Sequence, residues 1–111
     1  MFGFEKKIPE VTVDEVMRSL DTNESVVLLD VRTPGEYEKG KIAGSINVPV
    51  QDIASDVWKV VPEKGQKIYV YCLSGSRSNI AVEEMLKLGY TNVYSVKSGM
   101  LAWRIRNFPT V

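Results

Sequence analysis

Histidine is absent from the 111-residue sequence, and cysteine occurs once, as Cys72. A disulfide within the chain is therefore excluded, and so is a zinc site of the usual cysteine and histidine kind. The missing histidine also removes the commonest general base, which excludes a Ser–His or Cys–His catalytic couple. A nucleophilic Cys72 would need another source of activation.

An excess of charge is absent as well, because 14 basic residues balance 14 acidic ones. Such a chain has no overall field that would attract nucleic acid or an anionic membrane. No apolar run approaches the roughly 20 residues that span a bilayer. The charged pair Glu5 and Lys6 interrupts the short apolar start Phe2–Phe4, unlike a secretory signal. We expect a cytoplasmic protein with neither a nucleic-acid nor a membrane partner.

The length suits one compact domain, residues 1–111, and is too small for two ordinary ones. Short apolar runs alternate with amphipathic stretches, a pattern typical of an α/β domain with a mostly parallel sheet. The predicted strands are 26–31, 46–48, 67–71 and 93–96. The predicted helices are 13–20, 34–39, 53–60, 78–88 and 100–107. Trp58 and Trp103 are expected to be core aromatic residues, with Trp58 packed against the sheet.

Two of these helices have a clear starting signal. Thr12 with Glu15, and Thr33 with Glu36, have the spacing of a capping box. Glu36 is therefore expected to be a helix cap rather than an acid catalyst. Asp30 ends a predicted buried strand, where an unpaired carboxylate is costly, so we expect an arginine or loop N–H groups as its partners.

The candidate site follows the strand 67–71, at the end of the sheet where ligands bind in open α/β folds. Its residues, called here the Cys72 segment, are Cys72, Leu73, Ser74, Gly75, Ser76, Arg77 and Ser78. Gly75 can adopt positive φ, which allows successive N–H groups to face one anion. The following helix adds its positive N-terminal end, Arg77 adds a cation, and the three serines add hydroxyl donors. The Cys72 segment is therefore predicted to stabilise a negative charge on the Cys72 sulfur.

Magnitudes identify which of these groups matters most. A thiol with a pKa near 8.5 is only a few per cent ionised at pH 7, and a shift of about two pKa units corresponds to about 2.7 kcal/mol. A helix terminus supplies about 0.3–1 kcal/mol, whereas each hydrogen bond to a charged sulfur supplies roughly 1.5–3 kcal/mol. The N–H groups should therefore contribute most. The alternatives are an inert buried cysteine and an anion-binding loop with an incidental cysteine.

The Cys72 segment resembles the active-site loop of single-domain rhodaneses, the thiosulfate:cyanide sulfurtransferase family. A second block agrees with this family from Leu29 to Pro49, and a third includes Ser98, Gly99 and Trp103. The resemblance covers about residues 28–109. It implies a parallel five-stranded sheet with helices on both faces, and chemistry that needs no metal or cofactor. Met100 replaces a frequent second glycine, and we expect it at the pocket rim.

The same resemblance implies a persulfide mechanism with Cys72 as the catalytic residue. A small donor such as thiosulfate would give its outer sulfur to Cys72, and cyanide, a thiol or a sulfur-accepting protein would remove it. Residues 73–78 would bind the substrate, with Arg77 neutralising the donor or the leaving sulfite. Asp30 and Arg32 would support the site. We expect a monomer or a weak dimer.

The sequence also allows two other functions. One is a non-catalytic rhodanese-like module that binds partners or senses sulfur or redox state. The other is a phosphatase of the same fold, but those enzymes have one residue more between cysteine and arginine. They also usually have histidine before the cysteine, where this chain has Tyr71. Both differences disfavour the phosphatase.

Overall fold

Five parallel strands form one sheet in the computed structural model, which describes residues 7–111. The order across the sheet is β1-β5-β4-β2-β3, and every neighbouring pair is parallel. The strands are β1 (Glu10–Val11), β2 (Val27–Asp30), β3 (Ile46–Asn47), β4 (Ile68–Tyr71) and β5 (Val93–Val96). This confirms the predicted fold class. The segment Phe2–Lys6, which carried the expectation about a secretory signal, lies outside the described residues.

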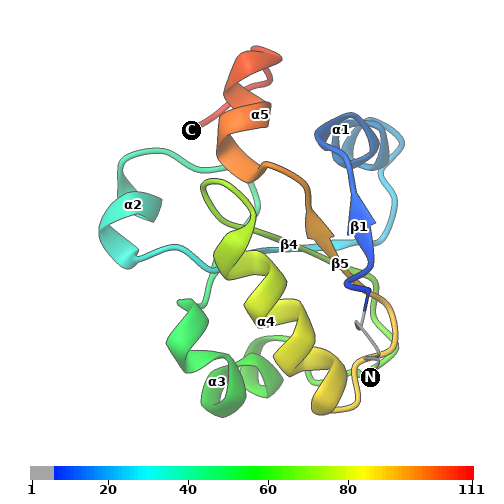
Figure 1. Cartoon of the computed structure of the whole chain (residues 1–111). Helices are drawn as coiled ribbons and strands as arrows, with labels where there is room; N and C mark the ends of the chain where they lie inside the picture. Colours follow the sequence, from blue (N-terminus) through cyan, green and yellow to red (C-terminus); the bar gives the residue numbers. More distant parts are fainter. Residues whose placement is uncertain (1–6) are drawn as a thin grey trace, which may run out of the picture.

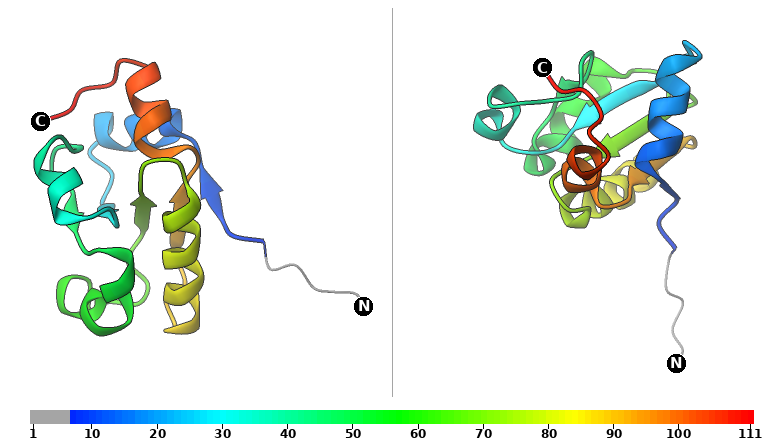
Figure 2. Two further views of the ribbon diagram at one scale, coloured as in Figure 1. Left: turned by 60° about the vertical axis from the view of Figure 1, so that its left-hand side comes forward. Right: turned by 90° about the horizontal axis from the view of Figure 1, so that it is seen from above.

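Helices cover both faces of the sheet (Figures 1 and 2). The helices are α1 (Val13–Asp21), α2 (Pro34–Glu38), α3 (Ile53–Val60), α4 (Ser76–Lys87) and α5 (Gly99–Ile105), with a short 3-10 helix η1 (Val50–Asp52) before α3. One core cluster lies between the sheet and α3 with α4, and the other lies between the sheet and α1 with α5. Within residues 7–111, no helix has both the length and the apolar character to cross a membrane.

Alternation along β4 places its side chains on opposite faces. Ile68 and Val70 belong to the cluster under α3 and α4, whereas Tyr69 and Tyr71 belong to the cluster under α1 and α5. Cys72 directly follows the strand and belongs to the cluster with Ile68 and Val70. Its sulfur is therefore on the side of the sheet that α4 covers.

Both predicted capping boxes are confirmed. The Thr12 hydroxyl accepts from the Glu15 N–H at 3.2 Å, and the Glu15 carboxylate accepts from the Thr12 N–H at 2.6 Å. Thr33 and Glu36 make the same reciprocal pair at the start of α2. These local signals locate two helix starts to the residue, because each cap satisfies backbone N–H groups that have no partner inside the helix.

The structure differs from the sequence-based expectation at Trp58, at β1 and at the start of α4. Trp58 is 56% exposed, so the expectation that it packs against the sheet was wrong, whereas Trp103 is fully buried as expected. The two-residue strand β1 was not predicted, since Glu10–Val11 is too short to show an alternating pattern. Helix α4 begins at Ser76, two residues earlier than predicted, because Gly75 adopts the left-handed conformation that lets the helix start immediately after it.

Candidate active site

Two backbone N–H groups point at the sulfur of Cys72. The N–H of Gly75 donates to Sγ at 3.1 Å, and the N–H of Ser78 donates to it at 3.3 Å. The Ser78 hydroxyl oxygen lies 3.7 Å from the same sulfur. Cys72 has no exposed surface. The sulfur is thus buried, but it lies among donors rather than among apolar groups alone.

The backbone conformation of Gly75 creates this arrangement. Gly75 has φ +110° and lies immediately before the first residue of α4. Ser78 is the third residue of that helix, where the N–H has no acceptor within the helix. The sulfur takes the place of that acceptor. Because α4 starts at Ser76, Ser76 and Arg77 belong to its first turn rather than to the predicted loop.

The N-terminal end of α5 holds the other side of the Cys72 segment. The N–H of Met100 donates to the Cys72 carbonyl at 2.9 Å, and the N–H of Leu101 donates to the Leu73 carbonyl at 3.1 Å. Figure 1 shows the start of α5 beside the loop between β4 and α4. Met100 itself is fully buried in the core under α1 and α5, so the expectation that it lies at a pocket rim was wrong.

These contacts change the acidity of the thiol. Burial raises the pKa of Cys72, but hydrogen bonds from the N–H and hydroxyl of Ser78 and from the N–H groups of Gly75 and Ser74 lower it by more. The net result is a lowered pKa. Hydrogen bonds to the charged form favour that form, and low polarity around them makes each one stronger.

The serine side chains of the segment have different positions. Ser74 and Ser76 are exposed, whereas Ser78 is fully buried. The Ser78 hydroxyl also lies 2.8 Å from that of Ser95, a fully buried residue of β5 that the sequence reasoning missed. A polar residue inside the apolar strand Val93–Val96 was the available signal. Leu73 is half-buried against the core under α1 and α5.

Arg77 forms a two-pronged ion pair with Glu36. Its Nη1 lies 2.7 Å from Oε1 and its Nη2 lies 3.1 Å from Oε2. This hydrogen bonding, followed by smaller contributions from Thr33, holds the pKa of Glu36 at about 2 against the opposing effect of burial. The cap role of Glu36 is confirmed, and its contact with Arg77 adds a link between α2 and the first turn of α4 that the sequence did not reveal.

Asp30 and Arg32 form a buried pair beside this region. The Asp30 carboxylate accepts from the backbone N–H of Arg32 at 2.8 Å and from its Nη2 at 2.7 Å. Arg32 also donates to the Gly40 carbonyl at 2.7 Å. The expectation that Asp30 takes an arginine partner is confirmed. The pair ties the end of β2 to the chain after α2, the helix whose Glu36 contacts Arg77.

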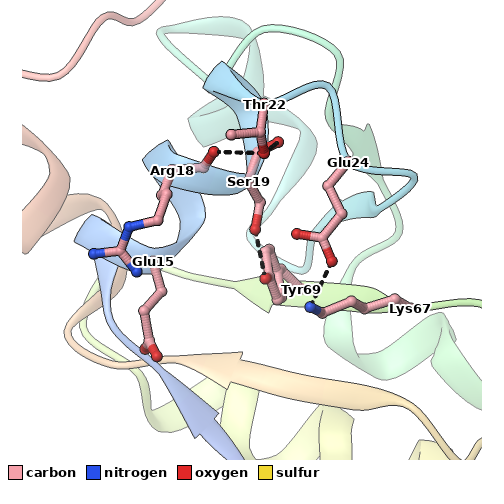
Figure 3. Close-up of a pocket in the computed structure, with 7 residues that line it drawn as sticks. All are labelled: Glu15, Arg18, Ser19, Thr22, Glu24, Lys67 and Tyr69. Atoms are coloured by element: carbon pink, nitrogen blue, oxygen red, sulfur yellow. Dashed lines mark hydrogen bonds and ion pairs between the residues drawn. The ribbon is translucent and has the colours of Figure 1, made fainter.

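A separate surface cavity of about 280 Å³ lies near the start of β4 (Figure 3). Two pairs lie within its polar lining: Lys67 lies 2.7 Å from Glu24, and the Ser19 hydroxyl lies 2.8 Å from that of Tyr69. Lys67 precedes β4 whereas Cys72 follows it, so the cavity is at the opposite end of the strand from the sulfur.

Comparison with known families agrees with this geometry. The model of the rhodanese-like domain matches residues 12–106. The chain belongs to this family. The resemblance seen in the sequence is thereby confirmed, and the matched region includes the Cys72 segment, the Asp30–Arg32 pair and the start of α5.

Relatives within the rhodanese-like family cover most of the chain. A protein of Allochromatium vinosum named "Sulfurtransferase" is 29% identical over 104 residues, which are 94% of this chain and 95% of that protein. The "Putative sulfur carrier protein YrkF" of Bacillus subtilis is 34% identical over 96 residues, which are 86% of this chain. The chain spans only 51% of YrkF. The names of both relatives refer to the handling of sulfur.

A solved structure has a similar fold. The rhodanese-related protein of Thermoplasma volcanium is 32% identical and superimposes with a TM-score of 0.81. The similarity covers 93% of this chain and 97% of that one. The α/β fold with its parallel five-stranded sheet is therefore the fold of a rhodanese-like domain.

Proposed function

We propose that the protein is a sulfurtransferase in which Cys72 carries sulfane sulfur as a persulfide. The observation that supports this most is the pair of N–H groups, from Gly75 and Ser78, directed at one buried sulfur. Such donors stabilise a thiolate, and the thiolate is the reactive form of cysteine. The names of the two relatives agree with sulfur as the group transferred.

The proposed reaction has two steps. The Cys72 thiolate attacks the outer sulfur of thiosulfate, a new S–S bond forms, and the S–S bond of thiosulfate breaks. Sulfite leaves with the electron pair of that bond, and Cys72 becomes a persulfide anion. Cyanide or a thiolate then forms a bond to the outer sulfur, and the S–S bond of the persulfide breaks. The acceptor leaves as thiocyanate or as a persulfide, and the electron pair of the broken bond restores the Cys72 thiolate. Neither step needs an external oxidant or reductant.

The residues around Cys72 have distinct roles in this proposal. The N–H groups of Gly75 and Ser78 stabilise the anionic sulfur before and after transfer. Arg77, a residue of the segment, pairs with Glu36 and offers its remaining N–H groups to the anionic donor or to sulfite. Asp30 and Arg32 fix the neighbouring elements. Because Cys72 has no exposed surface, the Cys72 segment must open for the donor to reach the sulfur.

That burial also favours a second candidate, a rhodanese-like module that binds partners or senses sulfur without turnover. A sulfur that stays enclosed would be protected from small donors. The two candidates differ in one respect that can be measured. The enzyme exchanges sulfur with a donor and an acceptor, whereas the module keeps its fold and leaves both unchanged.

The deciding experiment uses purified protein with thiosulfate, and then with cyanide. Intact mass after thiosulfate should rise by about 32 Da, one sulfur atom, on the peptide that contains Cys72. Cyanide should remove the added mass and yield thiocyanate. Cys72→Ser should show neither change, while Ser25→Ala, at an exposed serine outside the Cys72 segment, should retain both. If the wild-type protein gains no sulfur from thiosulfate or from persulfide donors and forms no thiocyanate, the enzyme is excluded.

A further inference from the structure

The hydroxyl of Ser95 lies directly behind the donors that surround Cys72. Ser95 is on β5 and is fully buried. In the sheet it is the register partner of Val70 on β4, and neighbouring residues of parallel strands point to the same face. Its Oγ therefore faces α4, where it lies 2.8 Å from the Oγ of Ser78.

The direction of that hydrogen bond follows from counting protons. Each hydroxyl has one proton to donate. Ser78 has three neighbours that could accept: the Gly75 carbonyl at 3.1 Å, the Ser95 hydroxyl at 2.8 Å and the Cys72 sulfur at 3.7 Å. For Ser95, the described residues offer Ser78 as the partner. If Ser78 donated to Ser95, the buried Ser95 proton would have no acceptor, which is costly. Ser95 therefore donates to Ser78.

Because Ser95 donates to Ser78, the Ser78 proton can bond either to the Gly75 carbonyl or to the Cys72 sulfur, depending on the charge of the sulfur. When Cys72 is a thiol, its S–H is directed at the Ser78 oxygen, and Ser78 donates to the Gly75 carbonyl. When the sulfur is anionic, the Ser78 O–H turns to the sulfur. The Gly75 carbonyl keeps another donor, the Asn79 N–H at 3.1 Å. Rotation of one hydroxyl therefore adapts the site to both states and leaves the Cys72 sulfur, the Ser78 hydroxyl and the Gly75 carbonyl paired in each.

We infer that Ser95 is a positioning residue for Cys72: it donates to the Ser78 oxygen and so holds the Ser78 hydroxyl where its proton can turn to the anionic sulfur. This inference rests on the proposed function, in which Cys72 works as a thiolate and a persulfide. Ser95 lies below the segment and has no exposed surface, so it acts through Ser78 and does not touch the substrate.

Charged groups around the segment are already paired. Arg77 is close enough to Cys72 for electrostatic interaction, and its guanidinium is held by Glu36. Asp30 is held by Arg32. Replacing Ser95 changes none of these pairs, so the titration of Cys72 should respond to the hydroxyl alone.

The test compares the pH dependence of the iodoacetamide alkylation rate in the wild type and in Ser95→Ala. At pH values below the midpoint of the wild-type alkylation profile, loss of one hydrogen bond should lower the fraction of Cys72 in the thiolate form roughly threefold to tenfold. The midpoint of the profile therefore moves to higher pH. Ser19→Ala is the matched control, because Ser19 is also a buried serine bonded to another hydroxyl at 2.8 Å (Figure 3). Its midpoint should match that of the wild type. Ser95→Thr, which keeps the hydroxyl, should restore the wild-type midpoint.

A double variant tests the route of the effect. Ser78→Ala should raise the midpoint, and adding Ser95→Ala to it should raise the midpoint no further. An unchanged midpoint in Ser95→Ala would overturn the inference, and so would a Ser95 effect of the same size without the Ser78 hydroxyl. Alkylation needs neither a sulfur donor nor an acceptor, and the ultraviolet absorbance of the thiolate gives the same midpoint without any reagent reaching the buried sulfur. The result therefore stays readable even if the thiosulfate and cyanide experiment fails.

Discussion

Gly99 approaches Cys72 so closely that a methyl group on Gly99 would lie 2.1 Å from the Cys72 carbonyl oxygen. The same methyl group would lie 3.0 Å from the Leu73 carbonyl oxygen. These two carbonyls are the ones that accept from Met100 and Leu101 at the start of α5. Gly99 also has φ +37°. The absence of a side chain at residue 99 is therefore what lets α5 hold the backbone of the Cys72 segment.

Gly99→Ala should destabilise the protein and disturb the site. The new methyl group collides with backbone, which cannot rotate away as a side chain would, so we expect a loss of about 3 kcal/mol or more in the free energy of unfolding. Denaturant unfolding measures this loss, and slower persulfide formation should accompany it. Gly65→Ala is the control, because nothing lies within 4 Å of its added methyl group. Equal stability of the two variants would contradict the proposed clash.

Local signals predicted the parts of this structure that depend on residues close in sequence. The capping boxes at Thr12 and Thr33 were found because each cap joins residues three positions apart. The strand and helix at 93–96 and 53–60 were found with their correct limits, because each has a clear apolar pattern. The start of α4 was missed because Gly75 allows it through its backbone conformation and not through a capping side chain.

Contacts between elements that lie far apart in the sequence could not be predicted from the sequence. Glu36 meets Arg77 across 41 positions, and Ser78 meets Ser95 across 17. Which side chains meet depends on strand order and helix placement, which a single sequence does not specify. The resemblance supplied the five-stranded sheet and agreed with the role proposed for Cys72, but it did not give the direction of these polar side chains. The exposure of Trp58 was missed for a related reason, since a large aromatic residue is buried in most positions.

Glu36→Gln should reduce stability at neutral pH by about 1 kcal/mol, a value discounted for the partial exposure of the ion pair. Glutamine can still accept from the Thr33 N–H, so the change removes the charge and spares the cap. The folded pKa of Glu36 is about 2, below the value of about 4.3 for an unperturbed glutamate. The contribution of the Glu36 carboxylate to the free energy of unfolding is therefore present above about pH 4.3, and it is lost as the pH falls toward the pKa of Glu36 in the folded protein.

Urea unfolding of wild type and Glu36→Gln from pH 6 down to pH 3 measures this dependence. The difference in unfolding free energy between the two proteins should shrink with acidification. Glu15→Gln is the control, since Glu15 has the same place in the capping box of α1 but does not pair with Arg77. Its effect at neutral pH should be less than about 0.5 kcal/mol. A pH-independent difference for Glu36→Gln would contradict the ion pair.

The two tryptophans should behave differently on replacement. Trp103→Phe should cost about 2 kcal/mol or more, since it leaves a gap in the core and removes the bond from Nε1 to the Pro109 carbonyl at 2.8 Å. Trp58→Phe should cost less than about 0.5 kcal/mol. Acrylamide should quench the fluorescence of Trp103→Phe strongly, because only exposed Trp58 remains. Weak quenching in that variant would contradict the exposure of Trp58.

Folding should become more favourable with rising pH through the ionisation of Cys72. The folded pKa of this thiol is lowered, whereas the unfolded thiol titrates near about 8.5. Between the two values the unfolded chain binds more protons, so stability rises with pH there. The contribution is fully present above about pH 8.5 and is lost as the pH falls through the folded pKa.

Denaturant unfolding under reducing conditions, from pH 6 to pH 9, measures this contribution as the difference between wild type and Cys72→Ser. The difference should move in favour of the wild type as the pH rises, and Cys72→Ala should give the same slope because it too has no thiol to titrate. Groups elsewhere in the chain cancel in the comparison. A flat or falling difference would mean that the N–H groups of Gly75 and Ser78 do not favour the anion, and the persulfide proposal would then lose its physical basis.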